Sequence, residues 1–210
     1  MPTIIVWDLD GTILDTDRLF APVNERVAAV AGISLEQALA SRRRVAKTAF
    51  TLPAWLHDVG LSGQIVEQLV ADINSDLARR APDCLYEGVR ALLEELPVRH
   101  VLATAGDPEF QAQKFGLLGL GHCFKAEDRH FVPRQGSKAD VINNYTGSGP
   151  VAFVENLSEW HWEVVREGLL VTQIRILWPG SATSAPSGGD GVRWQIATTI
   201  SHLRQLLTSS

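Results

Sequence analysis

The chain has 210 residues, 45% of them hydrophobic and 20% charged, with a formal net charge of -5. This composition is that of an ordinary globular protein, and the acidic balance disfavours a nucleic-acid partner, which requires clustered Lys and Arg. Cys84 and Cys123 lack metal-binding spacing and are expected to be reduced thiols. No apolar run is long enough to cross a bilayer and no leader pattern precedes the first strand, so we expect a cytoplasmic protein with no membrane partner.

The first predicted element is a short apolar run at residues 3–7 (TIIVW), which is typical of a buried strand. Only helical patterns follow it as far as about residue 83: PVNERVAAVAG, SLEQALASRRRVAKT, PAWLHDVG and GQIVEQLVADINSDLARR. We therefore predict a small all-helical domain at residues 18–83, inserted after the first strand. Its basic run, Arg42 to Arg44, has the pattern of a solvated helix face, although Arg42, Arg44 or Lys47 would reach an anionic substrate if this domain covered the site.

Strands and helices alternate in the rest of the chain. Strand-like runs lie at residues 100–103, 150–154 and 171–177, with a weaker one near 123–126. Helical patterns lie at residues 87–96, 108–120, 137–145, 158–167 and 194–207. Asp107, Ser137 and Ser158 stand at positions where they can cap three of these helices. The alternation predicts a Rossmann-like α/β core at residues 1–17 and 84–210, with a parallel sheet between two helical layers, and the segment 181–191 (SATSAPSGGDG) is predicted to be a surface loop.

The first strand ends in two acids, Asp8 and Asp10, followed by Gly11 and Thr12. Alternate residues of an extended chain share a face, and ligands of parallel sheets bind beyond the carboxyl ends of the strands. Crowded carboxylates repel each other unless a cation or a proton is present. A simple Asp-Gly turn explains Asp10 and Gly11 but not an apolar strand that ends in DxDGT.

The DLDGT motif after an apolar strand resembles the first signature of the haloacid dehalogenase superfamily, and the resemblance extends over essentially the whole chain. It implies that Asp8 is a nucleophile that forms an aspartyl-phosphate, and that Asp10 is the general acid and base. It also implies Mg²⁺ held by the Asp8 carboxylate and the main-chain carbonyl of Asp10. Members similar to 2-haloacid dehalogenases lack the second acid, so Asp10 favours phosphoryl chemistry.

The resemblance also implies a phosphate-binding hydroxyl and a lysine. Thr104, at the end of the HVLATAG strand, matches the hydroxyl position, and Ala105 would supply a main-chain amide. Lys138 is the preferred lysine, because it follows a capping Ser in the order expected after Thr104. Lys125 is the runner-up, and Lys114 is expected to be a solvated helix residue.

The last signature departs from the family pattern, because VENLSE carries Asn156 where an Asp is usual. In one alignment Asn156 replaces the metal-binding carboxylate and is a weaker ligand for a hard cation. In another, Glu155 and Glu159 do the work of the usual aspartates, or Glu155 reaches the metal or its waters while Asn156 supports it. Apart from these two alignments, both glutamates can be interpreted as solvated residues at a helix start, where the helix dipole favours acids.

These features predict a Mg²⁺-dependent phosphohydrolase that acts on a small phosphorylated metabolite enclosed between the core and the helical domain. The alternative is a protein of the same fold with a degenerate metal site, weakly active or serving as a binding or regulatory module. A 2-haloacid dehalogenase is disfavoured by Asp10. The substrate's identity and the oligomeric state do not follow from the sequence.

Overall fold

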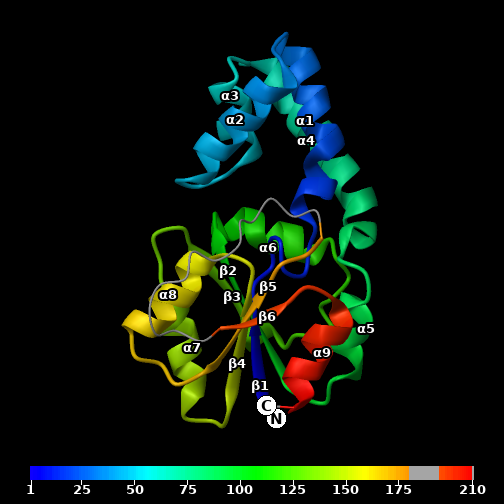
Figure 1. Ribbon diagram of the computed structural model, residues 1–210. Helices are drawn as coiled ribbons and strands as arrows, with labels where there is room; N and C mark the ends of the chain where they lie inside the picture. The colour runs from blue at the N-terminus through cyan, green and yellow to red at the C-terminus, as the bar shows by residue number, and fades with distance from the viewer. Residues whose placement is uncertain (180–193, 210) are drawn as a thin grey trace.

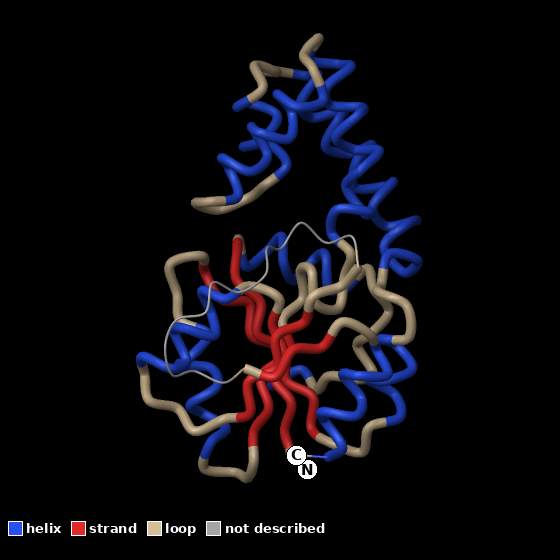
Figure 2. The backbone as a smooth tube through the Cα atoms, in the orientation of Figure 1, coloured by secondary structure: helices blue, strands red, loops and turns tan. Residues whose placement is uncertain are grey.

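The computed structural model describes residues 1–179 and 194–209, so the loop predicted at residues 181–191 lies outside the described residues. Within them, one parallel sheet has the strand order β3-β2-β1-β4-β5-β6. The predicted α/β class with a parallel sheet is confirmed (Figures 1 and 2). The strands are β1 (Ile4–Trp7), β2 (Arg99–Gly106), β3 (Arg129–Pro133), β4 (Val151–Glu155), β5 (Thr172–Ile176) and β6 (Gln195–Ala197).

The sheet is buried on both faces, because successive residues of β1 enter different hydrophobic clusters. Ile5 and Trp7 belong to the cluster that includes side chains of α5 (Val89–Glu95), α6 (Pro108–Gly116) and α9 (Ile200–Ser209). Ile4 and Val6 belong to the cluster that includes α7 (Lys138–Thr146) and α8 (Ser158–Arg166). This explains why β1 consists of consecutive apolar residues rather than an alternating pattern.

Four α-helices come between β1 and α5 in the chain and lie beyond the carboxyl edge of the sheet (Figure 1). Three of them begin at a side-chain cap, provided by Asp15, Ser34 and Thr51 respectively. The helical patterns predicted for this segment are thus present as helices, whereas the predicted domain boundaries at residues 17/18 and 83/84 stay a prediction. The helices are α1 (Thr16–Ala31), α2 (Leu35–Ala46), α3 (Leu52–Asp58) and α4 (Gln64–Arg80), followed by the 3-10 helix η1 (Ala81–Cys84).

Two predicted elements are wrong. The weak strand expected near residues 123–126 is turn structure leading into the 3-10 helix η2 (Ala126–Asp128), and the strand β3 begins only at Arg129. The apolar Phe124 serves the core instead, with its ring 5.5 Å from that of Phe115. The helix expected from residue 194 begins at Ile200, because the residues before it pair with β5 as the short strand β6.

No helix in the described part of the chain has the length and apolar character needed to span a membrane.

Candidate active site

Asp8 lies at the carboxyl end of β1, in the middle of the sheet, and is buried. Its main-chain N–H donates to the carbonyl of Val154, 3.0 Å away, so the β1–β4 pairing continues to this residue. The chain then turns sharply at Gly11, whose φ of 77° favours glycine. The turn is held in place by Trp178, whose indole N–H donates to the carbonyl of Thr12 at 3.0 Å.

Lys138 bridges two carboxylates at this edge of the sheet. Its Nζ is 2.6 Å from Oδ1 of Asp8 and 2.5 Å from Oε2 of Glu155, and the lysine is 1% exposed. Ser137 positions it, because the Ser137 hydroxyl caps α7 by accepting from the N–H of Asp140. Burial alone would lower the pKa of Lys138, but Asp8 and Glu155 raise it, so the ammonium stays charged.

Glu155 is fully buried and both of its oxygens have donors. Oε2 accepts from Lys138, while Oε1 accepts from the N–H groups of Asn156 (2.8 Å) and Leu157 (2.9 Å). The alternative that Glu155 is a solvated helix-start residue is therefore wrong. Glu159, in contrast, has a side chain 56% exposed and pairs with Arg134 at 3.0 Å.

The pKa of Asp8 is raised to about 7, because the carboxyl is desolvated and faces Glu155, and Lys138 compensates only in part. One ammonium thus serves two buried carboxylates. The positive charge of Lys138 therefore does not balance the negative charge of Asp8 and Glu155 together.

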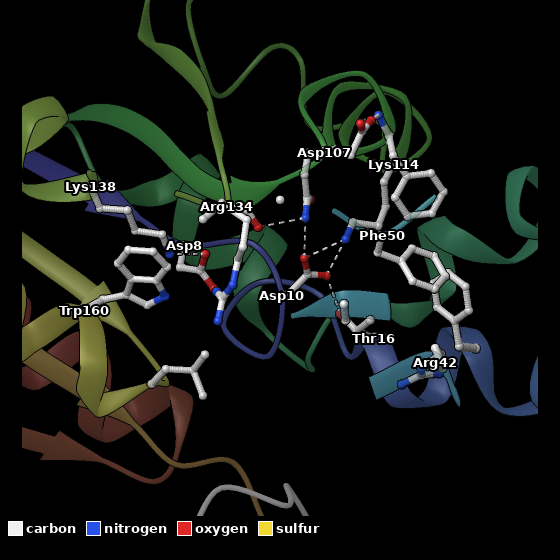
Figure 3. Close-up of a pocket in the computed structure, with 17 residues that line it drawn as sticks. Asp8, Asp10, Thr16, Arg42, Phe50, Asp107, Lys114, Arg134, Lys138 and Trp160 are labelled. Atoms are coloured by element: carbon white, nitrogen blue, oxygen red, sulfur yellow. Dashed lines mark hydrogen bonds and ion pairs between the residues drawn. The ribbon is translucent and has the colours of Figure 1, made fainter. Parts of the chain in front are cut away.

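Asp10 accepts hydrogen bonds on both carboxylate oxygens. Thr16 Oγ1 is 2.5 Å from Oδ1, Gln111 Nε2 is 3.0 Å from Oδ2, and Lys114 Nζ is 2.6 Å from each oxygen (Figure 3). Burial would raise the pKa of Asp10, but Lys114, Thr16 and Gln111 together outweigh burial and lower it. Asp10 is consequently held as a carboxylate.

The expectation that Lys114 is a solvated helix residue is wrong, since the residue is 4% exposed. It shares the inward face of α6 with Gln111 and Phe115, which are also buried. This helical spacing was the available signal, because Lys114 follows Gln111 by three residues and precedes Phe115 by one. Lys125, the runner-up for the catalytic lysine, is exposed on the turn before η2.

Asn156 is buried beside the turn that follows Asp8. Its Oδ1 has no hydrogen-bond partner within the part of the chain that the structure describes. A Cβ added to Gly11 would lie 2.9 Å from Cγ of Asn156, so the glycine makes room for this side chain. An unpartnered amide oxygen therefore lies beside the main chain of Gly11, although Asn156 does not itself line the pocket that contains Asp8 and Asp10.

The Asp8 carboxylate, the Asp10 carbonyl and the Asn156 amide oxygen are hard oxygen donors and suit Mg²⁺ in chemical type. They carry one negative charge fewer than a site with Asp at position 156. Across residues 1–179 and 194–209, the one trio of Asp, Glu, His or Cys able to share a metal ion is Glu94, His122 and Cys123, which does not line this pocket.

Thr104 and Ala105 lie at the end of β2, next to β1 in the sheet. The hydroxyl of Thr104 is buried and has no partner among the described residues, and this residue does not line the pocket. Ala105 does line it, and its carbonyl accepts from Gln111 Nε2 at 3.2 Å. The predicted phosphate-binding roles of the two residues stay predictions.

A pocket of about 300 Å³ joins these groups to the four-helix segment (Figure 3). Its floor includes Asp8, Asp10, Lys114 and Lys138. The opposite wall comes from α1, α2 and the loop after α2, and consists of Thr16, Phe20, Arg42, Ala46 and Phe50.

Among the basic residues considered for the helical domain, Arg42 is brought to this pocket. Arg44 instead pairs with Asp58 at 2.5 Å, within the four-helix segment. Lys47 lines a neighbouring cavity of about 280 Å³ together with Arg134. Arg44 is thus exposed as expected for a solvated helix face, with 62% of its side chain accessible, whereas the Arg42 side chain is 15% exposed and lines the pocket.

Residues 2–155, well over half of the chain, match the haloacid dehalogenase-like hydrolase family. The chain belongs to this family, as its first signature indicated. Among curated proteins, none matches the sequence significantly.

Several solved structures share the fold. The putative HAD-hydrolase YfnB from Bacillus subtilis, bound to magnesium, has a TM-score of 0.65 at 14% identity over 99% of both chains. The L-2-haloacid dehalogenase from Xanthobacter autotrophicus, with chloropropionic acid covalently bound, has a TM-score of 0.61 at 15% identity over 99% of both chains. The protein tyrosine kinase A (PtkA) of Mycobacterium tuberculosis has a TM-score of 0.60 at 21% identity over 98% of both chains. At these identities the likeness concerns the fold alone.

Proposed function

We propose that this hydrolase is a Mg²⁺-dependent phosphohydrolase that cleaves a small phosphorylated metabolite through an aspartyl-phosphate on Asp8. The observation that supports it most is the buried pair of Asp8 and Lys138 at the floor of the pocket, with Asp10 on the same floor. A nucleophile carboxylate held beside an ammonium is what attack on an anionic phosphoryl group requires.

In the first step a carboxylate oxygen of Asp8 attacks phosphorus, the bond from phosphorus to the ester oxygen breaks, and that oxygen takes a proton from solvent, because Asp10 is ionised. In the second, water attacks phosphorus, inorganic phosphate leaves and the Asp8 carboxylate is regenerated. Asp10, ionised beside Lys114, is suited to accept the proton of that water and to return it to solvent, which balances the proton used in the first step. Lys138 offsets the charge between Asp8 and the phosphoryl oxygens.

Mg²⁺ would be held by the Asp8 carboxylate, the main-chain carbonyl of Asp10 and Asn156 Oδ1, and when bound it neutralises charge at the transferring phosphoryl group. Since the amide of Asn156 is neutral, we propose weaker metal binding than at a site with a carboxylate there. Glu155 acts through Lys138, because both of its oxygens already accept hydrogen bonds in this site.

The test is turnover of p-nitrophenyl phosphate and of a panel of phosphorylated metabolites, with Mg²⁺ and with a chelator. We expect metal-dependent release of phosphate that Asp8→Asn abolishes, while Lys125→Met, a change at an exposed lysine, retains it. Folded protein that releases no phosphate from any of these compounds contradicts the proposal.

The second candidate is a binding or regulatory module of the same fold, and Asn156 is the observation that favours it. We expect Asn156→Asp to raise the affinity for Mg²⁺ about tenfold, because a carboxylate replaces a neutral amide. If wild-type protein is inactive and Asn156→Asp gains metal-dependent turnover, the natural protein has a degenerate metal site and the second candidate is favoured. Release of chloride from 2-chloropropionate would instead favour a dehalogenase, against which Asp10 argues.

A further inference from the structure

The wall of the pocket that faces the catalytic carboxylates is aromatic. Phe20 and Phe50 from the four-helix segment meet Phe110 from α6, with ring centroids 5.8 Å (Phe20–Phe50), 5.2 Å (Phe50–Phe110) and 6.4 Å (Phe20–Phe110) apart. All three line the pocket, and Phe50 and Phe110 are only partly buried. Phe20 is 2% exposed and packs behind the other two rings, so the surface that stays available to a ligand comes from Phe50 in the four-helix segment and Phe110 on α6.

This wall offers few hydrogen-bonding groups. Of the residues that α1, α2 and the following loop place on the pocket, Thr16 already donates to Asp10. The guanidinium of Arg42 already donates to Asn24 Oδ1 (3.1 Å) and Asp17 Oδ1 (2.8 Å), and its Cζ lies 5.1 Å from the centre of the Phe20 ring. The remaining wall residues there are Phe20, Ala46 and Phe50, which offer only apolar side chains.

Figure 3 shows Asp8, Lys138, Arg134 and Trp160 together on one side of Asp10, and Lys114, Phe50 and Arg42 on the opposite side. The ammonium of Lys138 and the guanidinium of Arg134 also lie over the Trp160 ring, at 4.8 Å and 5.4 Å from its centre. At the opposite end, Lys114 Nζ lies 5.6 Å from the centre of the Phe110 ring but is bound to both carboxylate oxygens of Asp10. The pocket therefore has a charged end beside Asp8 and an aromatic end whose two cations, Lys114 and Arg42, already pair with carboxylates.

We infer that the aromatic end, Phe50 and Phe110 backed by Phe20, binds the organic group of the substrate, and that the substrate is a phosphate monoester of an aromatic alcohol rather than a sugar phosphate. The inference rests on the proposed phosphohydrolase function for the charged end. A polyol placed against these rings would lose hydrogen bonds to water without replacing them, whereas an aromatic ring would stack or pack edge-on.

The experiment compares benzyl phosphate with ethyl phosphate, because both are esters of primary alcohols and they differ chiefly in the ring. Ribose 5-phosphate serves as the polyol. We expect kcat/KM for benzyl phosphate to exceed that for each of the other two by about tenfold or more, in line with burial of one ring. Phe50→Ala and Phe50→Leu should each reduce the benzyl-to-ethyl ratio at least fivefold. Ile65→Ala, at a position 55% exposed on α4, should leave the ratio unchanged.

Binding of benzylphosphonate and ethylphosphonate, measured by calorimetry, separates this inference from the proposed function. Absence of turnover for all three esters counts against the phosphohydrolase, and the phosphonate affinities then decide on the aromatic site by themselves. The inference is overturned if benzyl and ethyl compounds are bound or cleaved equally well, or if Phe50→Leu and Ile65→Ala have the same effect on their ratio. Preference for ribose 5-phosphate overturns it as well, while leaving the phosphohydrolase intact.

Discussion

At the scale of single residues, Asp8, the proposed nucleophile, destabilises the folded protein when it is ionised. Its pKa is raised to about 7, above the ordinary value of 3.8, by burial and by Glu155. The folded state therefore binds a proton more tightly than the unfolded chain does. The stability that this proton contributes is fully present below pH 3.8 and is lost as the pH rises through 7.

We predict that Asp8→Asn removes this loss of stability at high pH. The amide does not ionise, and the charge of Lys138 then balances that of Glu155 alone. In metal-free buffer at pH 8, Asp8→Asn should unfold with a free energy higher than wild type by on the order of 3 kcal/mol, and the difference should shrink towards pH 4. Urea unfolding at several pH values measures it. Asp83→Asn, at an exposed carboxylate, is the control, and an equal effect of both substitutions would contradict the argument.

Lys114 was expected to be solvated, but it forms an ion pair with Asp10. We predict that Lys114→Met lowers the free energy of unfolding by about 2 kcal/mol, because Asp10 stays in a site whose main positive charge has gone. The Asp10 side chain is 31% exposed, so water moderates the loss. Lys125→Met should change the same free energy by less than about 0.5 kcal/mol, and a loss as large as that of Lys114→Met would show that the buried ion pair is not the cause.

Asp8 and Asp10 were predictable because an apolar strand that ends in DxDGT is specific. Lys138 was predictable because a capping serine precedes it in the right part of the chain. Lys114 was not, because a lysine on a helix is usually solvated, and only the docking of α6 on the sheet turns it towards Asp10. The spacing of Gln111, Lys114 and Phe115 marks the inward face of α6, but it does not identify Asp10, 104 residues away, as the partner of Lys114.

At the scale of elements, α7 and α8 begin in different ways although each has a serine at its start. Ser137 is the N-cap of α7 and accepts from the N–H of Asp140 at 3.0 Å. Ser158 is the first residue inside α8, whose N-cap position is Leu157 and which has no side-chain cap. The prediction that Ser158 caps its helix is therefore wrong.

We predict that Ser137→Ala lowers the free energy of unfolding by about 1 kcal/mol, because an N–H of the first turn loses its acceptor. Lys138 follows directly and should be held less firmly, so that turnover falls as well if the proposed function is right. Ser158→Ala should change stability by less than about 0.5 kcal/mol. Chemical denaturation of both variants is the measurement, and equal losses would mean that the cap is not what Ser137 contributes.

Elements with strong periodicity were predictable, whereas β3 and β6 were not. β3 begins with Arg129 and His130, which are only partly buried because the strand lies at the edge of the sheet, so an apolar run is not required. β6 has three residues, and its Gln195–Ala197 pattern was indistinguishable from the start of the amphipathic helix that follows. Pairing with β5 overrides local propensity there.

At the scale of the whole molecule, the chain passes between the sheet and the four-helix segment twice, and the two passages are tied together. The N–H of Asp15 donates to the carbonyl of Cys84 at 2.8 Å, and the N–H of Tyr86 donates to that of Ile13 at 3.1 Å. Because the pocket takes its walls from both parts, the geometry of these two passages sets how the aromatic end faces the carboxylates.

Arg80, at the end of α4, adds side-chain hydrogen bonds to these two main-chain bonds. Its guanidinium donates to the carbonyls of Arg18 and Leu19, both at 2.9 Å, on the first turn of α1. Its neighbour Arg79 makes no such link, since its side chain is 77% exposed and pairs with Asp76 on its own helix. A substitution at Arg79 is therefore a suitable control for the same substitution at Arg80.

We predict that Arg80→Met raises amide hydrogen exchange in residues 13–20 and 81–86 by about tenfold, because two charge-assisted hydrogen bonds between the passages are lost. Exchange in β1 and β4 should stay as in wild type, since the sheet does not depend on this contact. Arg79→Met should leave exchange in both passages unchanged. Mass spectrometry of the exchanged protein resolves these segments, and faster exchange throughout the sheet in Arg80→Met would instead mean that the arginine stabilises the fold as a whole.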